Sequence, residues 1–140
     1  MAFYRIISYP ELSRLVQSQF VPRNVEQWCE HRPGTIMCVF EDVDFKATLH
    51  RFAATLASLR GLRPGDKLYV LHFLDLRPDR IELDTTATGW RSSRLYFDPV
   101  GVGAVKVVAS MTLAGDGPDS IRPGPVDEFV PAQDPADLCN

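Results

Sequence analysis

The residues of this sequence that are best suited to binding chemistry gather in a polar segment, residues 85–94, which reads TTATGWRSSR. Trp90 offers an aromatic face on which a ring can stack, and Arg91 and Arg94 carry forked donors that suit phosphate or carboxylate. The segment joins two expected strands, and loops held by a sheet often carry function. The alternative is a polar hairpin whose tryptophan folds onto the sheet.

Arg5 is the second candidate, because it stands within an apolar run, residues 2–7. A charged side chain in a strand is disfavoured where that face of the strand is buried. Arg5 is therefore expected either to line a pocket and bind an anion, or to lie on the solvent-exposed face of an antiparallel sheet.

Strong catalytic and metal-binding motifs are absent from the sequence. It contains no glycine-rich phosphate loop, no HExxH, no GxSxG and no paired CxxC. Cys29 and His31 stand two positions apart, but a zinc site needs further ligands that the neighbouring sequence does not supply. We therefore expect no metal. His72 alternates with apolar neighbours on an expected strand, and we assign it a structural role.

The elements that must position these residues follow the order strand, helix, strand, helix and then a run of strands. Ser8 and Glu11 have the spacing of a capping box at a helix start. Apolar residues at helical spacing predict an amphipathic helix over residues 45–59, with Phe52 at the centre of its core face. A short third helix is expected over residues 25–30. Expected strands cover residues 2–7, 35–40, 67–76, 80–86, 93–97 and 104–113. This order predicts an α+β fold, with two to three early helices packed on a mostly antiparallel sheet of about six strands.

Length and composition predict one globular domain over residues 1–113. The chain has 140 residues, of which 45% are hydrophobic and 24% charged, as is ordinary for a domain with its own core. No stretch is apolar enough for a membrane span, and the first residues lack the pattern of a signal peptide. Three cysteines at unrelated spacings make a poor disulfide framework, so a reducing, cytoplasmic location is expected.

Residues 114–140 differ from the body of the chain. They hold five prolines, few large apolar residues, and six acidic side chains against one arginine, a composition that predicts a disordered tail dispensable for folding. The tail's charge of −5 within a net charge of −3 leaves the body at +2. Nucleic-acid binders show a stronger basic balance, so this charge disfavours single-stranded RNA binding by Trp90, Arg91, Arg94 and Tyr96.

Short motifs along the chain resemble the ADP-ribosyltransferase fold of small bacterial and phage toxin or effector domains. The first expected strand carries an arginine, and the helix after it starts with Pro-Glu-Leu. The second strand ends in an aromatic residue and an acid, and an aromatic strand precedes the closing one. These motifs lie at residues 4–8, 9–12, 39–41, 94–97 and 104–108. The resemblance spans residues 3–110 and implies the same α+β architecture.

The resemblance implies that the domain binds NAD and transfers ADP-ribose to a protein target. In that family an arginine of the first strand, here Arg5, holds NAD, and a late glutamate stabilises the positively charged transition state. The expected place of the late glutamate falls at Leu95, so Glu82, one strand earlier, is the candidate catalytic acid, and Arg5 is the other candidate catalytic residue. The remaining NAD-binding candidates are Trp90, Arg91 and Tyr96.

The alternative is a catalytically inactive protein-interaction module of the same fold, acting as an effector or an inhibitor. Its acidic tail would serve as a flexible arm, and its partner would be a protein rather than a membrane or a nucleic acid. The two hypotheses differ in one structural feature, which is whether a carboxylate faces Arg5 across a cleft.

Overall fold

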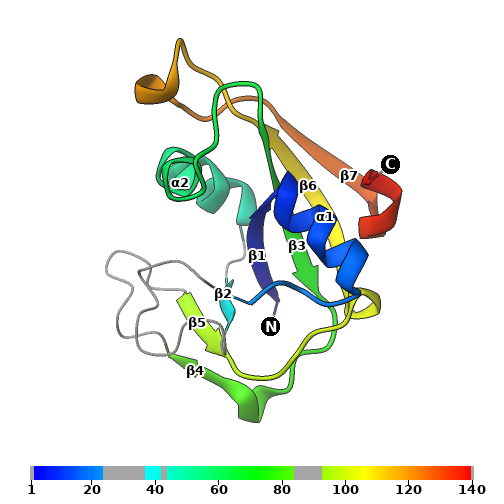
Figure 1. Cartoon of the computed structure of the whole chain (residues 1–140). Coiled ribbons are helices and arrows are strands. Elements are labelled where there is room, and N and C mark those ends of the chain that lie inside the picture. The colour runs from blue at the N-terminus through cyan, green and yellow to red at the C-terminus, as the bar shows by residue number, and fades with distance from the viewer. Residues whose placement is uncertain (1, 24–36, 42–43, 84–92, 140) are drawn as a thin grey trace.

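One antiparallel sheet of seven strands forms the centre of the computed structural model, which describes residues 2–23, 37–41, 44–83 and 93–139 (Figure 1). The strands are β1 (Phe3–Ser8), β2 (Met37–Glu41), β3 (Lys67–Phe73), β4 (Ile81–Leu83), β5 (Ser93–Tyr96), β6 (Val105–Thr112) and β7 (Val126–Gln133). Their order across the sheet is β4-β5-β2-β1-β3-β6-β7, and each neighbouring pair is antiparallel. The expected α+β class with its antiparallel sheet is confirmed, and β7 adds a strand to the six expected.

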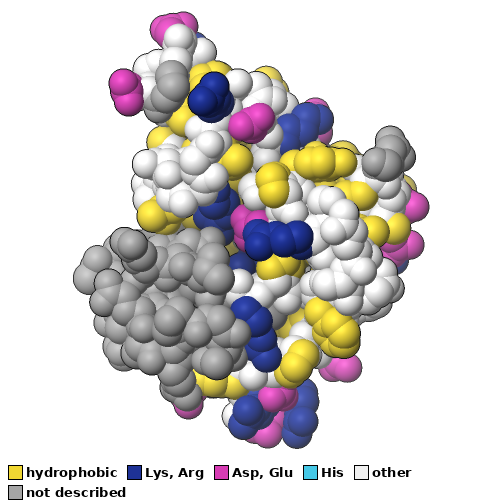
Figure 2. Space-filling model, in the orientation of Figure 1, with side chains coloured by type: hydrophobic (Ala, Val, Ile, Leu, Met, Phe, Trp, Pro, Cys, Tyr) yellow, Lys and Arg dark blue, Asp and Glu magenta, His cyan; other side chains and the backbone are white. Residues whose placement is uncertain are grey.

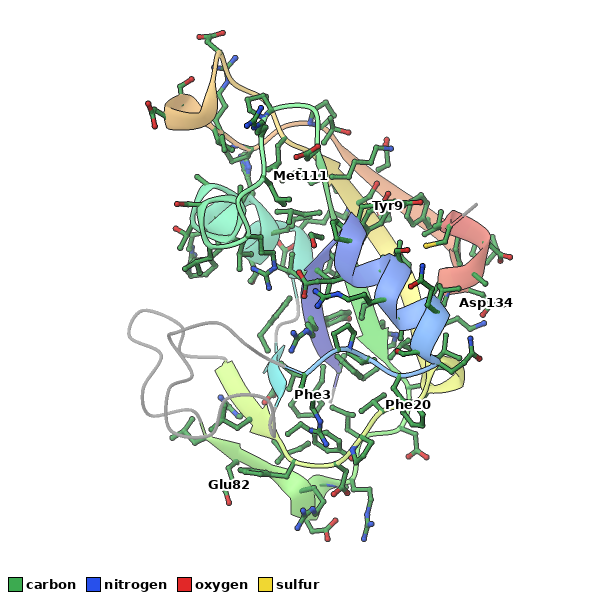
Figure 3. All side chains as sticks on the ribbon, viewed as in Figure 1. Phe3, Tyr9, Phe20, Glu82, Met111 and Asp134 are labelled. Carbon is green, nitrogen blue, oxygen red and sulfur yellow. The ribbon has the colours of Figure 1, made fainter. Side chains whose placement is uncertain are left out.

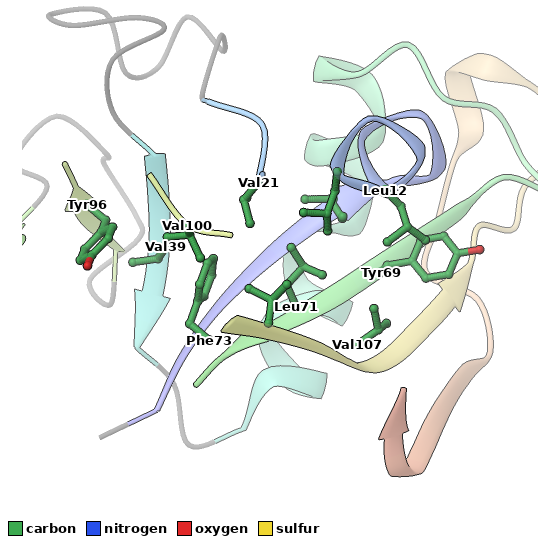
Figure 4. Packing of buried hydrophobic residues seen from close by; sticks show 12 residues of the cluster. Leu12, Val21, Val39, Tyr69, Leu71, Phe73, Tyr96, Val100 and Val107 are labelled. Atoms are coloured by element: carbon green, nitrogen blue, oxygen red, sulfur yellow. The ribbon is translucent and has the colours of Figure 1, made fainter. Parts of the chain in front are cut away.

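The helices α1 (Tyr9–Ser18) and α2 (Phe45–Leu59) cover opposite faces of the sheet (Figure 1). Successive side chains of a strand point to opposite faces, so Ile7 packs in the core on the α1 side and Ile6 in the core on the α2 side. Figure 4 shows the α1-side core. The short helix expected over residues 25–30 lies outside the described residues. Within the part of the chain that the structure describes, no helix is long and apolar enough to cross a membrane.

Helix α1 begins with the capping box that the sequence predicts. Ser8 Oγ accepts a hydrogen bond from the Glu11 amide at 3.4 Å, and Glu11 Oε1 accepts one from the Ser8 amide at 3.1 Å. This reciprocal arrangement satisfies two backbone donors at the helix start. The helix ends at Ser18, because Gln19 adopts a left-handed backbone with φ of 67° and donates its amide to the Leu15 carbonyl.

The core face of α2 is rotated from the face that the sequence predicts. Its buried residues are Thr48, Leu49, Ala53, Leu56 and Ala57. Phe52, which the spacing places at the centre of this face, is half-buried and packs at the margin of the core, and Leu59 is 47% exposed. The small side chains of Ala53 and Ala57 allow α2 to lie close to the sheet. The space between helix and sheet is then too narrow for Phe52, whose ring packs at the edge of this interface.

The acidic tail is folded, contrary to the disorder that its composition predicts. Strand β7 pairs with β6, with Val126 opposite Met111, and Phe129 packs against the α1-side core. Glu128 also contacts Lys46 of α2 at 2.8 Å. Strand pairing uses backbone groups that nearly every residue carries. An edge strand can therefore form with few large apolar side chains, which is why a count of such residues gives the wrong answer here.

Candidate functional site

Arg5, the expected anion-binding residue, is buried in a network of ion pairs. It is 4% exposed, and its Nη2 lies 3.7 Å from Glu11 Oε2. Glu11 Oε1 in turn lies 2.5 Å from Nε of Arg60, the residue that follows α2. A carboxylate thus contacts Arg5 directly, from the adjacent helix start. Arg5 is not among the described residues that line the two pockets discussed below.

Glu11 is the negative centre of this network, and its pKa is lowered. Burial by itself raises the pKa of the carboxyl group, but Arg60, Arg5 and the hydrogen bond from the Ser8 amide outweigh the effect of burial. Glu11 is therefore ionised at neutral pH and holds two guanidinium groups. The network ties the start of α1, the end of α2 and the middle of β1 together, which is a structural role for Arg5.

Glu82, the expected catalytic acid, lies on the face of the sheet opposite to Arg5. Ile81 packs against the α1-side core, on the same face as Arg5 and Ile7, so the next residue of β4 faces the other side. The Glu82 side chain is exposed on the outermost strand, and Figure 3 shows it at the margin of the molecule. The structure therefore does not bring the two expected catalytic residues together.

Of the three expected NAD-binding residues in or near β5, the structure describes Tyr96. Tyr96 is 2% exposed in the α1-side core, and its hydroxyl accepts a hydrogen bond from the Arg77 amide at 2.9 Å. This bond ties β5 to the connection that follows β3, so the hydroxyl serves the packing of two segments. Trp90 and Arg91 lie outside the described residues, as do Cys29 and His31.

His72 lies on the α2 side, where its neighbour is an aromatic ring. The rings of His72 and Tyr4 stack with centroids 5.0 Å apart at an angle of 26°. Burial lowers the pKa of His72, so its imidazole is neutral at pH 7. Among the described residues, no group of three or more His, Cys, Asp or Glu side chains is arranged to hold a metal ion.

A pocket of about 580 Å³ opens on the α1 side of the sheet, where β1 begins and β2 and β3 end. Phe3 is paired with Glu41 of β2 on one side and with Phe73 of β3 on the other, so the three side chains stand in one row on one face. Arg94 of β5, Ile81 of β4 and the connection after β3, which includes Asp75, also line the pocket. We call this space the Glu41–Arg94 pocket, and its volume is within the range of small-molecule sites.

The described residues of the Glu41–Arg94 pocket combine apolar side chains with more negative than positive charge. Phe3, Phe73 and Ile81 supply apolar surface. Among the described lining residues, the carboxylates of Glu41 and Asp75 stand against one guanidinium, and Arg94 Nη2 lies 3.5 Å from Glu41 Oε2. Both partners of this ion pair are partly exposed, so water weakens their attraction. The arrangement suits a flat, positively charged group.

Sequence reasoning did not assign Glu41 or Asp75 to a site, although both stand at the end of an expected strand or just beyond it. The sequence does contain an indication, because an acid that follows an apolar strand lies where that strand ends. This indication identifies a site only when the pairing of the strands is known, since the pairing puts Glu41 beside Phe3.

Comparisons with known proteins add no assignment to this geometry. No protein-family model matches the chain, and a comparison with curated proteins gives no match either.

Proposed function

We propose that this chain is an ADP-ribosyltransferase-like domain that binds NAD, with the nicotinamide end in the Glu41–Arg94 pocket. The observation that carries the proposal is the make-up of that pocket, whose described lining residues combine apolar side chains with two carboxylates and one guanidinium. The nicotinamide ring of NAD is planar and positively charged. Phe3 and Phe73 offer it aromatic contact area, while Glu41 and Asp75 offer it opposite charge.

In this proposal Glu41 takes the role that the sequence assigns to Glu82. When the bond between nicotinamide and ribose breaks, positive charge develops on the ribose carbon, and a nearby carboxylate stabilises that charge. A nucleophile of the protein target forms the new bond to the same carbon, and nicotinamide leaves as a neutral molecule. Arg94 holds the Glu41 carboxylate at the pocket wall through their 3.5 Å contact.

A catalytically inactive protein-interaction module is the second candidate, and two observations favour it. Arg5, the first-strand arginine of the resemblance, is committed to Glu11 inside the protein. The rim of the Glu41–Arg94 pocket also carries Leu74, whose side chain is 52% exposed, a feature suited to contact with another protein. In this reading the pocket accepts a basic side chain of the partner in place of NAD.

Calorimetric titration of NAD separates the two candidates. We expect saturable binding to the parent protein and about tenfold weaker binding to Glu41→Gln, because a lost charge interaction of about 1.4 kcal/mol is one decade of affinity. Glu82→Gln is the matched control, since it removes the same charge from an exposed residue on the opposite face, and it should bind NAD like the parent.

Two results would count against the assignment. No detectable binding of millimolar NAD to the parent would retire the nucleotide proposal and leave the interaction module. If NAD binds and labelled ADP-ribose is transferred to lysate proteins, loss of transfer in Glu82→Gln but not in Glu41→Gln would restore the acid that the sequence indicates.

A further inference from the structure

A second pocket, of about 240 Å³, lies between the start of α1 and the end of α2. Its charged lining residues are Glu11, Arg14, Arg23 and Arg60, and we call it the arginine pocket. Figure 2 shows dark blue side chains gathered around a magenta one in the middle of this face. None of the described residues that line the arginine pocket also lines the Glu41–Arg94 pocket, so we treat it as a separate site.

The charge of the arginine pocket is strongly positive. Three arginines line it, and a fourth, Arg5, lies behind Glu11. Glu11 is the one acid among the described lining residues, and its Oε1 already accepts from Ser8 at 3.1 Å and contacts Arg60 at 2.5 Å. One carboxylate therefore stands against four guanidinium groups, and the local balance is that of a site for an anion.

Arg14 and Arg23 are the two arginines that remain available to a ligand. Neither forms an ion pair with a described residue. Arg14 is exposed, whereas Arg23 is half-buried and its Nη2 donates to the Phe97 carbonyl at 3.5 Å. Arg23 Nη1 is buried without a hydrogen-bond partner in the described part of the chain. A buried donor of this kind calls for an acceptor, and an anion in the pocket would supply it.

We propose that the arginine pocket binds a phosphate group in its doubly charged form. Guanidinium forks match phosphate oxygens, and the excess of positive charge favours a dianion over a carboxylate. The volume of 240 Å³ is below the range for a whole drug-sized ligand, so the pocket takes the phosphate and leaves the remainder of the molecule outside. The half-exposed Leu59 at the pocket wall then contacts that remainder.

The test is a titration of the isotope-labelled chain with inorganic phosphate and with O-phosphoserine, followed by backbone amide NMR. We expect saturable shifts at Ser8, Glu11 and Arg60, about tenfold weaker binding in Arg14→Gln and in Arg23→Gln, and parent-like binding in Arg63→Gln. Arg63 is an exposed arginine outside the pocket, so this control loses the same charge.

The two ligands identify the source of the phosphate. Tighter binding of O-phosphoserine indicates a phosphorylated side chain, and equal binding indicates free phosphate or a small phosphate ester. Binding of O-phosphoserine should strengthen between pH 5 and pH 7, as the second proton leaves with a pKa of about 6. Absence of saturable shifts with both ligands, or equal weakening by Arg63→Gln, would overturn the proposal. Arg14 is exposed, so Arg14→Gln should remain folded and keep the test decisive.

Discussion

At the scale of single residues, the most informative feature is the pairing of Arg5 with Glu11. When the strand is considered alone, a charged residue within it is expected either to line a pocket or to lie on a solvent-exposed face of the sheet. The structure contains a third arrangement, in which the capping glutamate of the next helix supplies the opposite charge. Glu11 therefore has two roles, because it completes the capping box and neutralises buried arginines.

Glu11→Gln should destabilise the protein by about 3–5 kcal/mol, which is the scale for breaking a buried ion pair while the partner charge stays buried. Glutamine keeps the size of the side chain and an oxygen that can accept from the Ser8 amide. The lost quantity is then mainly the charge that offsets Arg5 and Arg60. Urea unfolding at pH 7 measures the change, with the exposed Glu82→Gln as the control, and a parent-like midpoint for Glu11→Gln would contradict the assigned role.

The difference in unfolding free energy between the parent and Glu11→Gln should depend on pH. The pKa of Glu11 is lowered from its ordinary value of 4.5 in the folded protein. Its stabilising contribution is thus fully present above pH 4.5 and is lost as the pH falls through the lowered value. The difference in unfolding free energy between parent and Glu11→Gln should accordingly narrow below pH 4.5, and a constant difference down to pH 2 would show that Glu11 does not titrate in this way.

At the scale of the elements, α2 offers a matched pair of leucines. Leu56 and Leu59 both belong to the apolar stripe of the sequence, but Leu56 is 2% exposed and Leu59 47%. Leu56→Ala should reduce the unfolding free energy by about 2–5 kcal/mol, as for a buried leucine. Leu59→Ala should change it by less than about 1 kcal/mol. Equal losses in chemical denaturation would favour the helix face that the sequence predicts.

The elements themselves were largely predictable, because their signals are local. The capping box of Ser8 and Glu11, the helix over residues 45–59 and six strands follow from spacing and side-chain type. The sequence does not specify which residues of α2 face the sheet. Apolar residues cover a wide part of the helix surface, and the face that is buried depends on which side chains fit against the strands. Phe52 shows this limit, because its type suits the core while its position allows only a half-buried place.

The candidate site was less predictable than the fold, because a site is formed by pairing between distant segments. Arg5 and Glu82 carry suitable groups, but strand alternation sends them to opposite faces. Glu41 and Arg94 meet because β5 pairs with β2, although they are far apart in the sequence. No residue near either position specifies this pairing, so the sequence could single out Arg94 but could not place Glu41 beside it.

At the scale of the whole molecule, the position of β7 decides whether β6 is an inner or an outer strand. With β7 in place, β6 has partners on both sides, and its residues Val107, Ala109 and Met111 are fully buried. Segments of the tail also cover both faces of the sheet, since Phe129 packs on the α1 side and Ile121 on the α2 side. The tail is therefore part of the fold that holds the two helices in place.

Deleting residues 116–140 should destabilise the protein by more than the roughly 1 kcal/mol typical of surface changes. The deletion removes the β7 ladder and leaves β6 as an open edge, which also favours association between copies. Chemical denaturation followed by circular dichroism measures the first effect, and light scattering measures the second. Glu128→Gln is the control, because it removes the exposed contact with Lys46 and keeps β7, so its midpoint should stay near that of the parent. A truncated chain that remains monomeric with the parent's midpoint would show that the tail adds nothing to the fold, as its composition alone suggests.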